Sequence, residues 1–419
     1  MPGIHPSAPS DSLCGGTRAC AGAAAEVKQS NGALGLVMGG GGARAAYQVG
    51  FLSCLARHRP QLEIPILTGV SAGAINTAFL ASHPGRFDDA VAELVRLWST
   101  LTTEQIIESD LLSFAGMLTR WGLRLVSGGS ALTPSVRGLV NTAPLRRFLE
   151  HALRARDGRI VGIGENLRRG RLSAAAITTT DYRTGQSITH VQGNAPPMWR
   201  RPHRRSEPAE LTVDHIMASA ALPLFFPAVR VGDSWHGDGG VRLTAPLSPA
   251  LHLGADRILA ISTRYGRSQA EADTPSTPGY PPPAQVLGVL MNAIFLDMLD
   301  FDALSMARIN DLVESLPPER RGDLRVVRLL VLRPSRDLAR LASDYEPRLP
   351  RPFRFLTRGL GTRETRSPDS LSMVLFEPPY LQHMIELGIQ DAERRLSEIE
   401  AFLGGEDLPL VQRTGFWRV

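Results

Sequence analysis

The sequence is short of several residue types, and each shortage narrows what the protein can do. Lysine is nearly missing, since Lys28 is the only one, and 46 Lys and Arg residues against 41 Asp and Glu leave a formal charge of +5. Nucleic-acid-binding proteins carry a denser positive field, so we expect no nucleic-acid partner. Three cysteines, Cys14, Cys20 and Cys54, cannot build a disulfide framework and indicate a reducing compartment.

Long hydrophobic runs are also missing. The longest apolar stretch, residues 286–298, is broken by Asn292 and Asp297. It falls short of the ~20 residues that a membrane-spanning helix needs, so we expect no segment to cross a bilayer. The first 32 residues do not resemble a signal peptide, which favours a cytoplasmic protein. No cluster of Cys and His residues has the spacing of metal ligands.

Composition divides the chain into five parts. Residues 1–32 are rich in Gly, Ala and Ser without a hydrophobic period, which is typical of a disordered leader. Residues 33–264 carry the motifs described below and form the main expected domain. A linker or exposed loop (265–284), a mostly helical extension packed on that domain (285–403) and a tail (404–419) follow. The strand pattern in "RVVRLLVLRPS" predicts that the extension adds a strand to the main sheet.

Two successive strand–turn–helix units indicate the fold class. A buried strand at 34–38 precedes a glycine turn and a helix at 43–57, and a strand at 64–68 precedes a turn and a helix at 72–82. Such units imply parallel strands with helical crossovers. Residues 87–156 look helical. The β-branched "LSAAAITTTDYRTGQSITHVQ" predicts a hairpin, and its neighbour "MWRRPHRRSEP" predicts a polar, arginine-dense loop.

The turn after the second strand reads "GVSAG" and sets Ser71 between two glycines. A strand that ends in this pattern and runs into a helix is typical of a nucleophile elbow, which exposes the serine hydroxyl above the sheet near a positive helix end. The pattern alone also fits an ordinary tight turn, since five-residue patterns occur by chance in a chain with 40 glycines.

The turn after the first strand reads "GGGGARAA". Successive glycine N–H groups at a helix start can point at one anion, which is what the oxyanion of acyl transfer requires. The same letters fit a dinucleotide fingerprint, Gly40-x-Gly42-x-x-Ala45. That alternative expects an acidic residue at the end of the second strand, whereas Glu63 falls at its beginning. The pattern therefore favours an oxyanion site.

A third element, "WHGDGG", contains Asp238 and would by itself be an Asp-Gly turn. In this order the three elements resemble the patatin-like phospholipase family, and the resemblance runs from about residue 34 to 263. The segments "SAALPLFFPAV" and "PLSPALHLGADRILAIST" resemble the family's sequence before and after its aspartate. The C-terminal "FEPPYLQHMIELGIQDAERRL" resembles the tail of bacterial members.

The resemblance implies a three-layer α/β/α sandwich with a mainly parallel central sheet and a helical C-terminal extension. It also implies a Ser-Asp dyad without histidine, in which Ser71 is the nucleophile and Asp238 the base. The remaining implied site residues are the oxyanion donors Gly40, Gly41, Gly42 and Ala72, the basic loop residue Arg44, and the supporting glycines Gly69, Gly73, Gly239 and Gly240. One position departs from the family pattern, because Ala45 stands where the loop usually continues with glycine.

The implied activity is hydrolysis of an ester bond of a phospholipid or related acyl lipid through an acyl-enzyme, with no metal or organic cofactor. The arginines of "WRRPHRR" could hold lipid phosphate or an anionic membrane surface, although a solvated loop is the simpler interpretation. An esterase or thioesterase acting on soluble acyl substrates, and a lipid-binding pseudoenzyme, are the alternatives. The sequence does not indicate an oligomeric state.

A conventional triad would need a histidine after Asp238, and His252 and His383 are the candidates by order. Both fall on expected helices, where packed or surface roles are more common, and His236 is expected to be a strand-end residue. Asp297 and Asp302 are not expected to act as a carboxylate pair, because a five-residue spacing does not place them on one face of a helix.

Overall fold

The structure is a computed structural model that describes residues 32–108, 138–194, 196–277, 279–365 and 367–406, and residues 116, 119 and 126. The chain divides into two compact units, Met1–Asn31 and Gly32–Val419, and only the second contains described residues. The expected leader up to residue 31, the tail from residue 407, and much of the stretch between 109 and 137 therefore lie outside the described residues.

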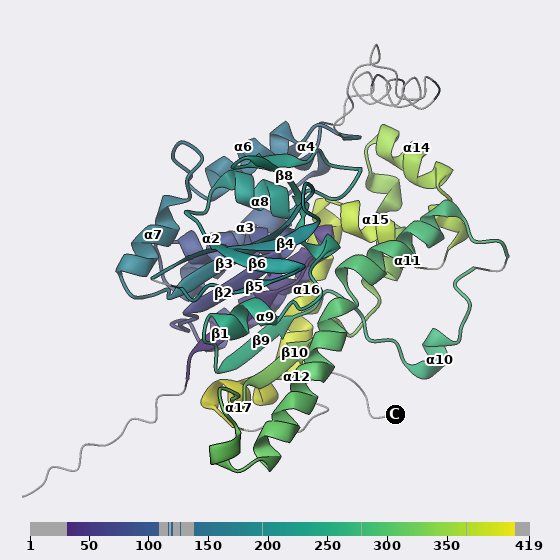
Figure 1. The fold of residues 1–419 in the computed structure, drawn as a ribbon. Helices are drawn as coiled ribbons and strands as arrows, with labels where there is room; N and C mark the ends of the chain where they lie inside the picture. Colours follow the sequence, from purple (N-terminus) through teal and green to yellow (C-terminus); the bar gives the residue numbers. More distant parts are fainter. Residues whose placement is uncertain are drawn as a thin grey trace, which may run out of the picture. The chain divides into compact units, whose positions relative to one another are not determined.

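A ten-stranded mixed sheet forms the centre of the second unit (Figure 1). Its order is β10-β9-β1-β2-β3-β4-β6-β5, and β8 pairs with both β3 and β7. The five strands from β10 to β3 are all parallel. The strands are β1 (Leu34–Met38), β2 (Ile66–Val70), β3 (Ala174–Asp181), β4 (Gln186–Gly193), β5 (Arg200–Arg201), β6 (Arg204–Pro208), β7 (Val229–Val231), β8 (Ser234–Asp238), β9 (Arg257–Ile261) and β10 (Arg328–Leu332).

Helices cover both faces of this sheet. The described α-helices are α1 (Ala46–His58), α2 (Ala72–Ser82), α3 (Phe87–Ser99), α4 (Thr103–Ile106), α6 (Ala143–Ala152), α7 (Val161–Arg168), α8 (Val213–Ser219), α9 (Ser248–His252), α10 (Gln269–Ala272), α11 (Pro283–Phe295), α12 (Met298–Ser315), α13 (Leu338–Ala342), α14 (Arg351–Gly359), α15 (Asp369–Val374), α16 (Pro378–Arg394) and α17 (Leu396–Gly404). Short 3₁₀ helices at Gly42–Ala45 (η1) and Gly239–Val241 (η2) follow β1 and β8.

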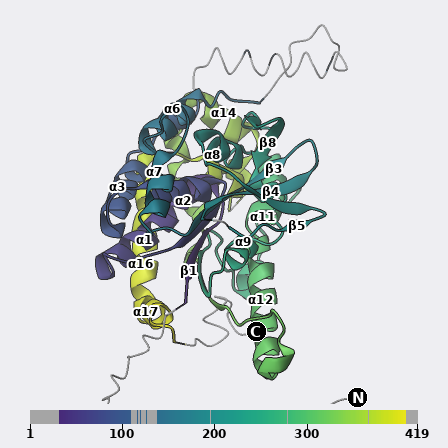
Figure 2. The same ribbon diagram turned by 60° about the vertical axis from the view of Figure 1, so that its left-hand side comes forward.

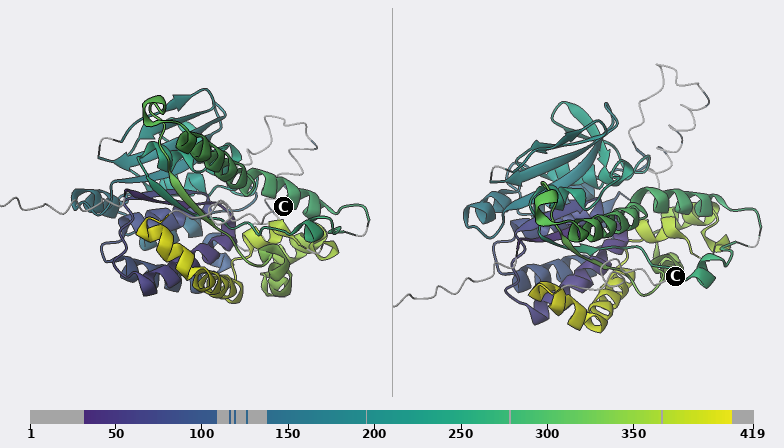
Figure 3. Two further views of the ribbon diagram at one scale, coloured as in Figure 1. Left: turned by 90° about the horizontal axis from the view of Figure 1, so that it is seen from below. Right: turned by 60° about the horizontal axis from the view of Figure 1, so that its bottom comes forward.

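Alternating side chains of each parallel strand supply two hydrophobic cores. Leu36 and Met38 of β1 belong to the larger core with α1, α2, α3 and α16, whereas Val37 between them belongs to the smaller core with α9 and α12. Figure 2 shows these two groups of helices on opposite sides of the sheet, and Figure 3 shows the purple and yellow helices together on one face. The expected three-layer α/β/α sandwich with a mainly parallel sheet is confirmed.

Local predictions from the sequence mostly match, with two differences. The hairpin is present as β3 and β4, which pair antiparallel. The expected arginine-dense loop is wrong, because residues 200–208 form the short strands β5 and β6 at the edge of the sheet. The second strand begins at Ile66 instead of residue 64, since Pro65 has no N–H for a sheet ladder; its carbonyl accepts hydrogen bonds from Ser173 and Ala174.

The C-terminal helix α16 packs tightly on α1, the first helix of the fold. A Cβ added at Gly50 would lie 1.9 Å from the Ile385 carbonyl oxygen, and one at Gly388 would lie 2.2 Å from that of Tyr47. Only glycine permits this approach of two helix backbones. The Tyr47 hydroxyl also donates to Asp391 Oδ2 at 3.1 Å. The C-terminal extension also supplies β10, which extends the sheet beside β9.

One described helical stretch, Pro283–Ser315, is long and apolar enough to cross a membrane by length and composition alone. This differs from the expectation that Asn292 and Asp297 interrupt the apolar stretch. The stretch comprises α11 and α12, and Asn292 accepts the backbone hydrogen bonds of Leu296 and Asp297 where the two helices meet. Only 28% of its most apolar part is buried inside the protein, whereas a core helix of a soluble protein is mostly buried.

Candidate active site

Ser71 lies on a sharp turn between β2 and α2. Its backbone has φ 56° and ψ −133°, a conformation that is strained for a residue with a side chain. The two flanking glycines permit the turn: a Cβ at Gly69 would lie 2.3 Å from Thr77 Oγ1, and one at Gly73 would lie 2.3 Å from the Met38 carbonyl oxygen. This is the geometry that the "GVSAG" pattern predicts, with the hydroxyl at the start of a helix.

Ser219 at the end of α8 holds this turn in place. Its hydroxyl accepts a hydrogen bond from the Ser71 N–H at 3.0 Å and donates one to the Thr178 carbonyl oxygen at 2.7 Å. Ser219 is fully buried. The strained turn after β2 is thus tied to the neighbouring strand β3 through one buried side chain.

Asp238 ends β8, which pairs with the end of β3 on the same edge as β2, because β4 occupies the whole of the other edge. Val70 pairs with Thr178 and Asp238 pairs with Thr179, so the end of β2 before Ser71 and the end of β8 meet at consecutive positions along one edge of β3. The Asp238 carbonyl oxygen accepts from Thr180 Oγ1 at 2.8 Å, and its N–H donates to the Ala221 carbonyl oxygen at 3.0 Å. Its backbone is therefore fixed from both sides.

The Asp238 carboxylate is completely buried, and burial raises its pKa to about 7. The Ser71 hydroxyl and the Gly240 N–H act in the opposite direction and lower that pKa. Oδ1 accepts from Gly240 N at 2.8 Å, whereas Oδ2 has no hydrogen-bond partner of standard geometry.

The two glycines after Asp238 leave no room for a side chain. A Cβ at Gly239 would lie 2.1 Å from the Thr178 carbonyl oxygen, and one at Gly240 would lie 2.4 Å from the Phe295 ring.

The glycine loop after β1 runs directly past Ser71. A Cβ at Gly40 would lie 2.9 Å from Ser71 Cβ, and Gly41 and Gly42 have positive φ values of 137° and 58°. Hydrogen bonds hold the loop by its carbonyl groups: Gln48 donates to Gly39 at 2.9 Å and Thr263 Oγ1 to Gly40 at 2.7 Å. Ala72 opens α2 beside the loop, and the first N–H groups of a helix have no intrahelical acceptor.

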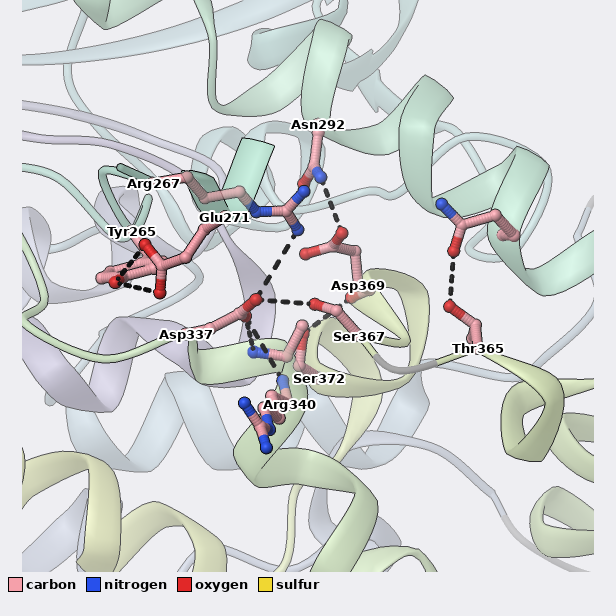
Figure 4. Close-up of polar contacts among 12 residues, drawn as sticks. Tyr265, Arg267, Glu271, Asn292, Asp337, Arg340, Thr365, Ser367, Asp369 and Ser372 are labelled. Carbon is pink, nitrogen blue, oxygen red and sulfur yellow. Dashed lines mark hydrogen bonds and ion pairs between the residues drawn. The ribbon is translucent and has the colours of Figure 1, made fainter. Parts of the chain in front are cut away.

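Arg44 points away from this site into the C-terminal extension. It is 3% exposed, its Nε donates to Ser372 Oγ at 2.7 Å, and its Nη2 pairs with Asp369 Oδ1 at 2.6 Å. The other oxygen of Asp369 accepts from Asn292 of α11 at 2.7 Å, a contact visible in Figure 4. Ala45, at the position where the family usually has glycine, is buried in η1. The basic loop residue is therefore an anchor that ties the loop to α15 and, through Asp369, to α11.

An apolar pocket begins at Ser71, Ala72 and Gly42. It runs between α2, α3, α4 and α6, where side chains such as Phe79, Trp98 and Leu149 line it. Met373, Val374 and Phe376 of the C-terminal extension form another part of the wall. A second cavity on the other side of Gly40 is lined by Phe295 and its neighbours at the end of α11.

The three histidines considered from the sequence have other surroundings. His252 stacks on Trp199 with ring centroids 4.6 Å apart, and His383 interacts with the Tyr345 hydroxyl at 2.9 Å. His236 is buried against Thr179 Oγ1 at 2.9 Å, and burial lowers its pKa. Each of these rings thus has a structural contact that accounts for its position.

The two aspartates of the α11–α12 region also have separate roles. Asp297 pairs with Arg264 at 2.9 Å, while Asp302 accepts from the Leu247 N–H at 2.8 Å and burial raises its pKa to about 6. Within the described ranges, no group of three His, Cys, Asp or Glu side chains is arranged to hold a metal ion.

Sequence reasoning missed the residues that support the site. Ser219 is the first residue of the "SAALPLFFPAV" segment, and that position was its only signal. Asp369 and Ser372 lie more than 320 residues from Arg44 along the chain, and no local pattern links them to it.

Comparison with known proteins gives a family match. The model of a family described as patatin-like phospholipase matches residues 36–251, just over half of the chain. Among curated protein sequences, none matches this chain.

Several solved structures are similar at low identity. One is VipD from Legionella pneumophila, with 13% identity, 88% of this chain and 67% of that chain covered, and a TM-score of 0.34. Another is human GIVD cytosolic phospholipase A2 in complex with methyl gamma-linolenyl fluorophosphonate, with 14% identity, 89% of this chain and 59% of that chain covered, and a TM-score of 0.43. A third is ExoU of Pseudomonas aeruginosa in complex with SpcU, with 19% identity, 57% of this chain and 47% of that chain covered, and a TM-score of 0.25. This chain thus spans about half to two thirds of the length of these proteins.

The family match covers the glycine loop, the turn at Ser71 and Asp238, which are the elements that carried the resemblance in the sequence. The chain belongs to the patatin-like phospholipase family.

Proposed function

We propose that this protein is a serine acyl hydrolase that cleaves carboxylic ester bonds of phospholipids or related acyl lipids. The observation that carries the proposal is the meeting of three features at one point: a strained Ser71, a buried carboxylate with one oxygen left unpartnered, and the end of an apolar pocket. Membership of the patatin-like phospholipase family supports a hydrolase acting on lipid esters.

In the proposed mechanism, Asp238 acts as the general base. Its carboxylate takes the proton from Ser71 Oγ as that oxygen attacks the ester carbonyl carbon. When the intermediate collapses, the C–O bond to the alcohol breaks, and Asp238 returns the proton to the leaving oxygen. An acyl-enzyme on Ser71 remains. Water then attacks this ester, Asp238 takes its proton, and release of the fatty acid restores the Ser71 hydroxyl.

The glycine loop is the proposed oxyanion hole. Because hydrogen bonds fix the loop by the carbonyl groups of Gly39 and Gly40, its N–H groups can serve the oxyanion. The Ala72 N–H at the start of α2 adds a donor and the favourable end of a helix dipole. A raised pKa of about 7 suits Asp238 for this task, since a carboxylate at its ordinary value is a weak base toward a hydroxyl.

The pocket supports an acyl chain as the substrate group bound next to Ser71. Its lining is almost entirely aliphatic and aromatic, and such a lining gains free energy by removing an alkyl chain from water, at about 0.8 kcal/mol per CH₂ group. Among the described lining residues, Ser71 is the one polar side chain available to recognise a charged group at depth. The headgroup would therefore remain outside the pocket.

Labelling with an active-site fluorophosphonate, followed by turnover of one short-chain soluble ester, tests the proposal. Ser71→Ala should abolish both labelling and turnover, and Asp238→Asn should abolish turnover. Circular dichroism should show a normal fold for both variants. His252→Ala and His383→Ala should retain kcat/KM within a few-fold, because neither ring contacts the site. A histidine variant as inactive as Ser71→Ala would contradict the dyad, since residues that act as a unit fail together.

Two further outcomes separate the alternatives. Folded protein that never reacts with the fluorophosphonate would be a lipid-binding pseudoenzyme. Equal rates on monomeric and micellar esters of the same acyl chain would instead favour an esterase or thioesterase with soluble substrates.

A further inference from the structure

Helix α11 turns its large apolar side chains toward solvent and its small and polar side chains toward the protein. This is the reverse of the usual arrangement for a surface helix of a soluble protein. Val286, Leu287, Val289 and Leu290 all point outward and are between 37% and 57% exposed. The inward stripe contains Ala284, Gly288 and the polar Asn292, which bonds to Asp369 inside the protein. A surface helix ordinarily turns its apolar stripe toward the core.

This helix also lacks charge along its whole length. From Pro283 to Leu296 the sequence contains no Asp, Glu, Lys or Arg, so nothing on α11 favours solvation of its outward face. A contiguous exposed apolar patch of this kind marks an interaction site.

The helix α14, whose end meets the start of α11, carries exposed positive charge. The Ala284 N–H donates to the Leu360 carbonyl oxygen at 2.8 Å, which joins the end of α14 to the start of α11. On α14, Arg351, Phe355 and Arg358 follow helical spacing on one exposed side, and the Phe355 side chain is 82% exposed. Among the residues that the structure describes, neither of these two arginines is paired with a carboxylate.

The other end of α11 lies at the candidate active site. Phe295 sits over Gly240, two residues from Asp238, and Asn292 contacts the aspartate that anchors Arg44. The helix that carries the outward apolar face therefore reaches the candidate active site at its C-terminal end.

From these observations we propose that the outward faces of α11 and α14 form one surface that lies on an anionic lipid bilayer. Uncharged apolar side chains beside unpaired arginines are the composition of a helix that rests in the membrane interface. Binding of this surface to a bilayer does not depend on the proposed function. Only its consequence does, namely that the bound surface brings the candidate active site to its lipid substrate.

Contacts inside the protein exclude the alternative that α11 and α12 cross the bilayer together. Leu299, Ala303 and Met306 of α12 pack in the smaller core against the sheet. Asp300 is buried in ion pairs with Arg264 and Arg333. Helix α11 alone has 13 residues and is about 20 Å long, well short of the ~30 Å hydrocarbon core. It can therefore lie on a membrane but cannot span one.

Vesicle flotation of the full chain tests this surface. The Ser71→Ala background prevents any hydrolysis during the measurement. The probes are vesicles of phosphatidylcholine alone and of phosphatidylcholine mixed with phosphatidylglycerol. We expect binding to the anionic vesicles, and the double variant Val289→Gln/Leu290→Gln should weaken it by about tenfold or more through lost apolar burial.

Three further double variants define which surface binds the vesicles. Arg351→Gln/Arg358→Gln should weaken binding to anionic vesicles by about fivefold per arginine and leave binding to neutral vesicles unchanged. Ile309→Gln/Leu312→Gln on α12 removes two apolar side chains of similar exposure and should have no effect. Arg200→Gln/Arg201→Gln in β5 tests the arginine-rich segment considered from the sequence and should also have no effect.

Three results would overturn the inference: wild-type chain that does not float with anionic vesicles, a control variant that loses as much binding as the α11 variant, or an α11 variant that changes the oligomeric state in light scattering and not the vesicle binding. The last would assign the surface to a second copy of the chain. Turnover of a short-chain soluble ester, measured with Ser71 intact, should be the same in all the surface variants. A wild-type chain that floats but does not turn over this ester would contradict the proposed function alone.

Discussion

Two strand-to-helix turns lie beside each other at the carboxyl ends of β1 and β2, and they are held in place by different parts of the chain. The turn at Ser71 is fixed by Gly69, Gly73 and Ser219, which all fall within residues 36–251. The glycine loop is fixed largely by Thr263, Asp369 and Ser372, which lie beyond that range.

Because the two turns are held by different parts of the chain, residues 36–251, which match the family, do not contain every residue that holds the candidate active site in place. A Cβ at Gly42 would lie 2.0 Å from the Met373 carbonyl oxygen, so α15 packs directly on the loop as well as anchoring Arg44. The C-terminal extension therefore forms part of the candidate active site, and variants of that extension should act on the first turn and spare the second.

The largest effect is expected from Asp369→Ala, which removes the partner of buried Arg44. Breaking a buried ion pair costs about 3–5 kcal/mol of unfolding free energy, because one charge is left uncompensated. The loop should also lose its shape, so kcat on a soluble ester should fall. The matched control is Glu393→Ala, which breaks the exposed pair with Arg57 at the surface of α16 and should cost under about 1 kcal/mol. Chemical denaturation of both variants measures the contrast, and equal losses would mean that Arg44 needs no anchor.

A second test compares neighbouring glycines of the first turn. An Ala at position 40 would press on Ser71, since the added carbon lies 2.9 Å from Ser71 Cβ and 3.4 Å from its Oγ. A misplaced nucleophile can cost about 100-fold in rate, while the φ of Gly40 is compatible with Ala. Gly39→Ala is the control, because its added carbon meets nothing within 4 Å. Steady-state kinetics with melting curves would contradict this geometry if both variants kept wild-type kcat.

The third prediction concerns the carboxylate beside the second turn. With a pKa of about 7 in the folded state and an ordinary value of 3.8, Asp238 holds a proton between about pH 4 and 7 that the unfolded chain has released. The stability that the protonated carboxyl provides is therefore lost as pH rises from about 4 to about 7, whereas turnover, which needs the ionised base, should rise around pH 7.

Asp238→Asn should consequently gain stability relative to the wild type between pH 4.5 and pH 8, by up to about 3 kcal/mol, because roughly 2.5 pH units separate pH 4.5 from the folded pKa. Unfolding free energies at the two pH values give the measurement. An Asn variant whose advantage does not grow with pH would place the pKa of Asp238 near its ordinary value.

The smallest effect is expected from Ser219→Ala. The substitution leaves the buried Ser71 N–H and the Thr178 carbonyl oxygen without their partner, at a cost of about 1–3 kcal/mol. Because this contact holds the second turn, kcat should fall with stability. Ser82→Ala removes a buried hydroxyl that bonds only within its own helix and should change much less. Equal effects of the two variants would remove Ser219 from the support of the turn.

Much of the fold was predictable because its signals are local. The buried run at β1, the "GVSAG" turn and the β-branched hairpin each depend on neighbours within a few residues. The boundaries were less predictable, since Pro65 moved the start of β2 and the arginine-rich segment was recruited to the sheet edge as β5 and β6.

The parts of the site that could not be predicted depend on distant residues. Arg44 was expected to belong to the glycine loop, but its direction is set by Asp369 and Ser372, for which the sequence near Arg44 gives no indication. The outward apolar face of α11 was similarly hidden, because composition reveals an apolar helix but not which of its faces the rest of the chain covers.

The crossing of α1 and α16 at Gly50 and Gly388 has a consequence for synthesis of the protein. Tyr47 and Asp391, which bond across this crossing, are 344 residues apart, so at about 5–20 residues per second the ribosome needs roughly 20–70 s to make the second after the first. Throughout that time the apolar side of α1 that α16 will cover has no partner. We therefore expect the nascent chain to remain protease-sensitive until α16 emerges, which pulse proteolysis of chains stalled before and after residue 394 would measure.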